Sequence, residues 1–282
     1  MTRLAEIEGH ISSMSELLDI VGAMRSLAAI RVQEAQRALP GIRQYAETMM
    51  RAIRAALLLM PQPVPEPRGF DGRSALILCA AEHGFVGCFN ERLIETAEAA
   101  LAPGDAFYVL GSHGGALAVD RGRQAVWTGP MATRLSGTPQ TIRHLESALY
   151  RSIANGEIAR VAIVFARYRK GGSHTIERHQ LLPLDLPSIA SSPPLQSPLH
   201  NLPPRVLVEK LMAEYVFARL AEAAVESIAS ENAARFSAME SAHDNVAKKL
   251  NQLDGEAHQA RQSEITAEIL DLITGTEAMV SR

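Results

Sequence analysis

The sequence has few of the features that mark a disulfide-bonded, membrane-spanning or secreted protein. Its 282 residues include only two cysteines, Cys79 and Cys88, which are too few for a disulfide framework and do not form a C-x-x-C pair. We expect both to be buried thiols of a protein in a reducing cytoplasm. The absence of any run of eighteen apolar residues excludes a transmembrane helix. The first ten residues lack an apolar stretch, so we expect no secretory signal.

Signatures of catalysis and of phosphate binding are also missing. The turn at residues 111–115 follows an expected strand but does not read G-x-G-x-x-G, and residues 82–90 lack the lysine and hydroxyl of a P-loop. We interpret both turns as structural bends that require glycine. No two of the nine histidines have H-E-x-x-H spacing, and neither Ser173 nor Ser230 lies in a G-x-S-x-G context. The sequence therefore predicts no catalytic residue, no cofactor site and no metal site.

The charge of the chain gives no reason to expect a nucleic-acid partner. Lysine and arginine number 28 and the acidic residues 31, for a net charge of -3. The segment from residue 205 onward has more acidic than basic residues. The basic run at residues 167–170, Arg-Tyr-Arg-Lys, is interpreted as a solvated strand end.

The first sixty residues carry apolar side chains at steps of three and four, which is typical of a coiled-coil helix. The expected seam consists of Leu4, Ile7, Ile11, Met14, Leu18, Val21, Ala28, Val32 and Ala35. Only Arg25 interrupts this seam. Pro40-Gly41 predicts a kink or a short break, because proline removes a helical hydrogen bond.

The last eighty residues show a second helical seam of the same kind. It consists of Val225, Ala229, Asn232, Phe236, Met239, His243, Val246, Leu250, Leu253, Ala257 and Ala260. The register then shifts to Ile265, Ile269 and Leu272. Because the ends of an inserted domain usually lie close together, we expect the two helices to pair antiparallel.

The middle of the chain alternates strand and helix patterns. Near-continuous apolar runs predict strands at 74–80, 106–110 and 160–166. Helical patterns follow these runs or separate them, at 91–101, 115–121 and 141–154. A last strand at 174–182 lies close after the third strand and could pair antiparallel with it. The predicted fold class is α/β with a long antiparallel two-helix coiled coil and a central Rossmann-like, mostly parallel sheet. The expected domains are the helix 1–60, the α/β domain 68–186 and the helix 205–279.

Two motifs of the second helix resemble the gamma subunit of the F-type ATP synthase. Residues 230–239 read Ser-Glu-Asn-Ala-Ala-Arg-Phe-Ser-Ala-Met, and residues 260–269 read Ala-Arg-Gln-Ser-Glu-Ile-Thr-Ala-Glu-Ile. The first helix is similar to that family more thinly, through Ala23-Met24 and Ala28-Ala29, and the turns at 84–90 and 111–114 resemble its two glycine turns. The resemblance covers the whole chain.

The sequence also departs from the family pattern. In the first helix, Gly22 stands where the family has a basic residue, and residues 15–21 stand where it has a polar stretch. Ala257-His258 replaces the Tyr-Asn pair that precedes Arg-Gln in the second helix. Glu82-His83 replaces the Asp-Arg pair before the first glycine turn. These departures favour a divergent paralogue, such as one from an alternative, N-type or sodium-translocating ATPase. Coupling to protons and coupling to sodium both stay open.

The resemblance implies a central-stalk rotor that couples ion transport to ATP synthesis or hydrolysis and has no active site of its own. The implied partners are the alpha and beta subunits, the epsilon subunit and the membrane c-ring, without insertion into the membrane. The implied location is the cytoplasmic face of a bacterial inner membrane. Arg261 and Gln262 would grip the surrounding ring, Met24 and Arg25 would face the moving lever of a catalytic subunit, and Arg235 is a further candidate contact.

Two other readings of the pattern remain. One is an α/β enzyme that binds a nucleotide or small ligand and dimerises through helical arms. The other is a homodimeric coiled-coil scaffold, in which the arms would pair between two copies of the chain.

Overall fold

The computed structural model describes residues 3–60, 73–184 and 199–280. The chain divides into two compact units: a first unit of Met1–Leu27 with Phe236–Arg282, and a second unit of Ala28–Arg235. Two long helices, α1 (Arg3–Leu57) and α6 (Pro204–Val280), contribute to both units. Among the described residues, no helix combines the length and the apolarity that crossing a bilayer requires.

The seam predicted for α1 is the less exposed side of that helix. Ile7, Val21, Ala28 and Ala35 are buried, and the exposed residues lie between them. The helix continues through Pro40, so the predicted alternative of a break is wrong. Packing of a buried helix face offsets the loss of one backbone hydrogen bond, because tertiary contacts supply most of the stability of a helix in a protein.

Helix α6 changes character along its length. In the second unit, residues 220–233 are buried on every side of the helix. One side packs on the sheet, and another packs on Ala35 and Leu39 of α1. In the first unit, burial is confined to seam positions such as Met239 and Leu253. Beyond residue 264 the apolar side chains of the shifted seam are exposed.

The second unit contains one five-stranded sheet in the order β3-β2-β1-β4-β5. Its strands are β1 (Arg73–Cys79), β2 (Ala106–Leu110), β3 (Trp127–Gly129), β4 (Ile158–Tyr168) and β5 (His174–Leu182). Strands β1 to β4 pair in parallel, and β5 pairs antiparallel with β4, so the predicted mostly parallel sheet is confirmed. The three-residue strand β3 was not predicted, because it is too short to show a periodic pattern.

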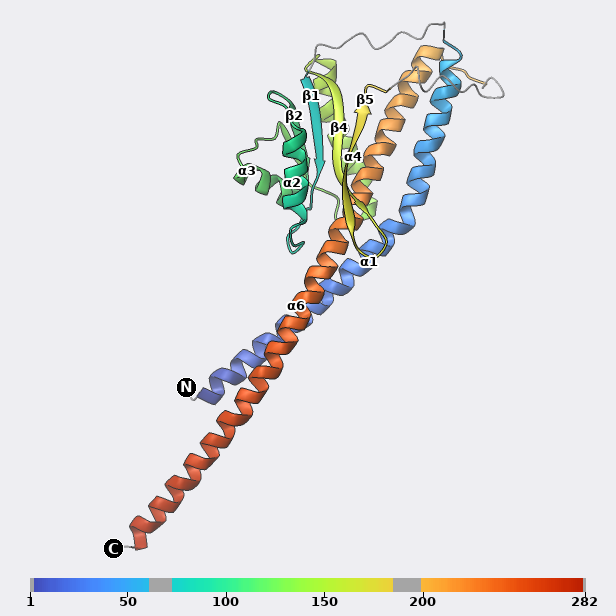
Figure 1. Cartoon of the computed structure of the whole chain (residues 1–282). Coiled ribbons are helices and arrows are strands. Elements are labelled where there is room, and N and C mark those ends of the chain that lie inside the picture. Colours follow the sequence, from blue (N-terminus) through green and yellow to red (C-terminus); the bar gives the residue numbers. More distant parts are fainter. Residues whose placement is uncertain (1–2, 61–72, 185–198, 281–282) are drawn as a thin grey trace. The chain divides into compact units, whose positions relative to one another are not determined.

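Helices cover both faces of this sheet. Helices α2 (Phe89–Ala100) and α3 (Ser112–Asp120) lie on one face, and α4 (Thr138–Ala154) and α6 lie on the other (Figure 1). A single 3-10 turn, η1 (Leu135–Gly137), precedes α4. Burial on both faces explains why the central strands are nearly continuous apolar runs.

Candidate subunit-contact surfaces

An exposed apolar stripe runs along α1 in the first unit. Leu17, Ile20, Met24 and Leu27 are spaced by three and four residues and therefore share one face of the helix. Ile20 and Leu27 are 57% and 52% exposed, so this face is not covered by α6. Met24 and the neighbouring Arg25 are half-buried. Exposed apolar stripes of this kind are typical of protein-binding surfaces.

Arg261 and Gln262 are exposed on α6, also in the first unit. Arg261 Nη2 donates to Glu8 Oε1 over 2.7 Å, which joins α6 to the start of α1. The two side chains are 56% and 50% exposed, so this ion pair contributes less than about 1 kcal/mol. A guanidinium has five N–H donors, so the pair with Glu8 uses only part of the binding capacity of Arg261.

Arg235 has a different environment, because its guanidinium is buried in the second unit. Its Nη2 donates to Glu231 Oε1 over 2.7 Å, to the carbonyl of His83 over 3.0 Å and to that of Gly84 over 3.2 Å. Its Nη1 donates to Asn232 Oδ1 over 3.2 Å. Arg235 therefore fixes the turn that follows β1. Its contact with a partner subunit stays a prediction.

Other residues of the same motif also make contacts inside the chain. Ser230 Oγ donates to the carbonyl of Ala166 over 3.0 Å, and Glu231 Oε2 accepts from the backbone N–H of Glu82 over 3.4 Å. Burial raises the pKa of Glu231, and the charge of Arg235 opposes that shift. This stretch of the family motif therefore attaches α6 to the sheet.

The carboxyl edge of the sheet, where an α/β enzyme would bind its ligand, is occupied by the chain's own groups. The Glu82 carboxylate accepts from the backbone N–H groups of Ser112 and Met131 over 3.0 and 2.8 Å. A Cβ on Gly114 would lie 2.1 Å from that of Ala80, so the turns after β1 and β2 pack directly on each other. This close approach requires glycine at position 114, as the interpretation of residues 111–115 as a structural turn predicts.

The interpretation of residues 167–170 as a solvated strand end is wrong for Arg167. This side chain is half-buried, and its Nε donates to Glu177 Oε2 over 2.8 Å. Its Nη1 lies 3.5 Å from Oε1 of Glu226, a buried residue of α6 that also accepts from Arg43. Glu222 and Glu226 are carboxylates four residues apart in an otherwise apolar stretch, and that spacing was the signal available in the sequence.

The comparisons with known proteins agree along the whole chain. A family model described as ATP synthase matches residues 3–279. The ATP synthase gamma chain of Streptomyces avermitilis is 30% identical over 286 residues, which cover 96% of this chain and 94% of that protein. The chain belongs to the ATP synthase gamma-chain family. This gamma chain is also 26% identical to the one from Hyphomonas neptunium, over 99% and 100% of the two chains.

Solved structures show the same fold. This gamma chain resembles a chain of the Euglena gracilis mitochondrial ATP synthase rotor with a TM-score of 0.64 at 14% identity, over 93% of this chain and 98% of that one. It resembles a chain of the Tetrahymena thermophila central stalk and c-ring with a TM-score of 0.56 at 16% identity, over 79% and 99%. The predicted family and fold class are confirmed.

Proposed function

We propose that this gamma chain is the rotor of an F-type ATP synthase, coupling rotation of a membrane c-ring to catalysis in a ring of alpha and beta subunits. The observation that carries this function is the antiparallel pairing of α1 with α6 inside each unit. In the first unit Glu8 pairs with Arg261, and in the second Ala35 and Leu39 pack with Val225 and Ala229. Two helices packed along a seam resist twisting better than one helix alone.

The first unit carries the proposed contacts with the catalytic ring. The stripe around Met24 offers apolar surface beside the half-buried Arg25, and a moving lever of a catalytic subunit would press against that surface. Arg261 and Gln262 offer exposed hydrogen-bond donors, which suit a polar grip on a surrounding ring. Apolar contacts around Met24 and polar contacts of Arg261 and Gln262 can form and break as the shaft rotates, so they would transmit force without preventing rotation.

We further propose that residues 1–60 and 205–279 form the shaft, and that the α/β domain 68–186 binds the epsilon subunit and the c-ring. The complex would lie at the cytoplasmic face of a bacterial inner membrane, with this chain peripheral to it. An α/β domain whose ligand edge is filled by its own Glu82 and Gly114 is better suited to a structural role than to catalysis.

The grip assignment is tested by the double variant Arg261→Ala, Gln262→Ala in the assembled enzyme. We expect ATP hydrolysis to continue while ATP-driven ion pumping into vesicles falls, because exposed side chains contribute to coupling and little to stability. The matched control is Lys248→Ala with Asn251→Ala, which removes one cation and one amide from exposed positions of the same helix. Normal pumping by the Arg261/Gln262 variant would refute the assignment.

A further inference from the structure

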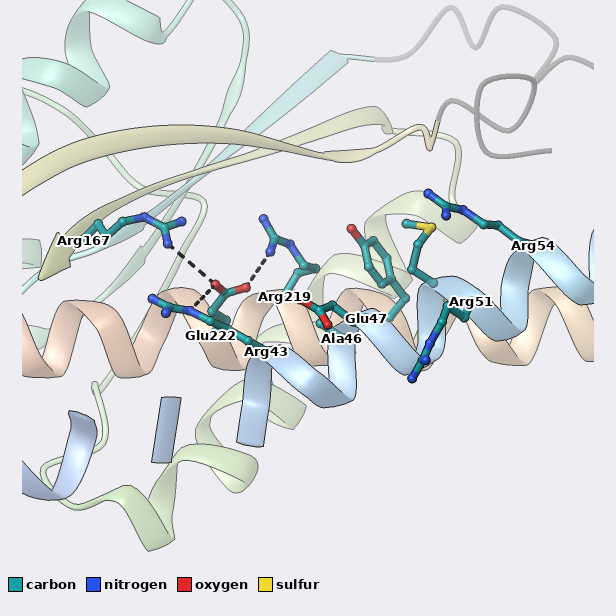
Figure 2. A pocket seen from close by; sticks show the side chains of 10 residues that line it. Arg43, Ala46, Glu47, Arg51, Arg54, Arg167, Arg219 and Glu222 are labelled. Atoms are coloured by element: carbon teal, nitrogen blue, oxygen red, sulfur yellow. Dashed lines mark hydrogen bonds and ion pairs between the residues drawn. The ribbon is translucent and has the colours of Figure 1, made fainter. Parts of the chain in front are cut away.

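A groove lined with arginine lies between α1 and α6 in the second unit (Figure 2). Its volume is about 650 Å³, and half of its ten lining residues are arginines. They are Arg43, Arg51 and Arg54 of α1, Arg167 of β4 and Arg219 of α6. Only two lining residues, Glu47 and Glu222, are acidic, so the groove is positively charged.

A buried carboxylate holds three of these arginines together. Only 5% of the Glu222 side chain is exposed. Its Oε1 accepts from Arg43 Nε over 3.3 Å and lies 3.9 Å from Arg167 Nη1, and its Oε2 accepts from Arg219 Nη1 over 2.5 Å. Figure 2 shows the three guanidinium groups converging on this one side chain. Arginines that are fixed in this way lose little conformational entropy when they bind a ligand.

Arg219 is oriented from a second side as well. Its Nη2 lies 3.0 Å from His179 Nδ1, and His179 Nε2 lies 3.0 Å from Glu177 Oε2. Because a guanidinium can only donate, His179 Nδ1 accepts from Arg219, and His179 Nε2–H donates to Glu177. These contacts occupy two of the five N–H donors of Arg219, and the others are available to a ligand.

The excess positive charge comes from the last turns of α1. Arg43, Arg167 and Arg219 face the carboxylates of Glu177, Glu222 and Glu226, whereas the structure records no ion pair for Arg51 or Arg54 within the described ranges. Arg51 Nη2 donates to the hydroxyl of Thr48 over 3.1 Å. Arg54 lies in the final turn of α1. Against Arg51 and Arg54 the lining adds only the carboxylate of Glu47, so the groove keeps an excess of positive charge, which favours an anionic ligand.

We propose that the groove binds a compound with a phosphate group, held by Arg54 and Arg219, with Met50 and Tyr215 contacting its organic part. A guanidinium offers two parallel N–H donors that match a tetrahedral oxyanion, and several guanidiniums supply more donors than one carboxylate can accept. The ligand is either a free phosphate compound or a phospholipid headgroup, which present the same group. This inference concerns the second unit and does not depend on the rotor function.

The test is calorimetric titration of the full chain with inorganic pyrophosphate at fixed ionic strength. We expect Arg54→Gln to weaken binding by roughly tenfold or more, because hydrogen bonds between charged groups are worth at least that factor. Arg219→Lys keeps the charge, loses the planar fork and should also weaken binding. The matched control is Arg160→Gln, an exposed arginine outside the groove, which should bind as the wild type does.

A second arm distinguishes the two sources of phosphate. The full chain is co-sedimented with phosphatidylglycerol vesicles and, for comparison, with phosphatidylcholine vesicles. The ligand is a lipid headgroup if the chain binds the phosphatidylglycerol vesicles, if Arg54→Gln abolishes that binding and if pyrophosphate competes with it. Pyrophosphate binding without vesicle binding reports a free phosphate compound. No measurable binding of either probe, or equal affinity in the wild type, Arg54→Gln and Arg160→Gln proteins, would overturn the proposal. Melting temperatures equal to that of the wild-type protein establish that the variants are folded.

Discussion

Glu226 shows how one side chain can connect three elements of the second unit. It is fully buried on α6, and it accepts from Arg43 of α1, from the backbone N–H of Tyr168 over 3.1 Å and from Arg167 Nη1 over 3.5 Å. Such a carboxylate is costly to bury alone and is stabilised only by its partners. Without it, the backbone N–H of Tyr168 would lose its acceptor, and Arg43 and Arg167 would keep only Glu222 and Glu177 as hydrogen-bond acceptors.

We therefore expect Glu226→Ala to lower the free energy of unfolding by about 3 kcal/mol, because it removes the acceptor of the Tyr168 N–H and one of the carboxylate partners of Arg43 and of Arg167. The measurement is urea denaturation followed by circular dichroism. The control is Glu209→Ala, which removes an exposed glutamate paired with Arg205 on the same helix and should change stability little. A loss no larger than that of the control would contradict the proposed role of Glu226.

Residue-level prediction succeeded where the signal was local in sequence. The seam positions Ile7, Val21 and Ala28 are buried as predicted, because the period of a helix determines which residues share a face. The environment of Arg167 was wrongly predicted, because its partner Glu226 lies 59 residues away in sequence. No pattern around Arg167 itself indicates that partner.

At the scale of elements, α4 and α6 bring two carboxylates close together. Burial raises the pKa of Glu146 on α4 to about 7, and the charge of Glu214 on α6 contributes to that shift. Glu214 also accepts from the Tyr45 hydroxyl over 2.8 Å. A raised pKa in the folded state means that the folded protein holds this proton more tightly than the unfolded chain does.

The sign of the pH dependence follows from this shift. The contribution of Glu146 to stability is fully present below its ordinary pKa of 4.5 and is lost as the pH rises through about 7. We expect Glu146→Gln to remove part of the fall in the free energy of unfolding between pH 5 and 7, measured by urea denaturation. Glu240→Gln, at an exposed position of α6, should leave that profile unchanged. An identical profile for both variants would disprove the role of Glu146.

Prediction of helices and strands was accurate for long sequence patterns. It failed for a very short strand and at a proline where packing keeps the helix continuous. The parallel strands were predicted because burial on both faces makes them apolar runs, whereas β3 has only three residues. The break at Pro40 did not occur because buried Leu39 and Ala46 hold α1 on both sides of it. The seam pattern places Arg25, Arg235, Arg261 and Gln262 on or beside the helical seams, but their role as subunit contacts, with that of Met24, comes from the family resemblance and stays a prediction.

At the scale of the whole molecule, the two units differ in how much core each has. Buried apolar residues of the first unit are few, namely Ile7, Val21, Met239 and Leu253 among those described. The second unit has core clusters on both faces of its sheet. A two-helix pair with so little buried surface opens at low free energy cost, whereas opening a packed sheet approaches the cost of global unfolding.

Helix α6 allows this difference to be measured within one continuous element. Residues 220–233 are buried on all sides and residues 240–260 only along a seam, so backbone amides of the second stretch should exchange with deuterium much faster in the free chain. Both stretches have the same secondary structure, so the contrast reports packing alone. In an assembled synthase, catalytic subunits around the first unit would slow exchange at 240–260 and leave 220–233 nearly unchanged. Equal protection of the two stretches in the free chain would contradict the difference in core. Unchanged exchange at 240–260 after assembly would show that the ring does not enclose this part of the rotor.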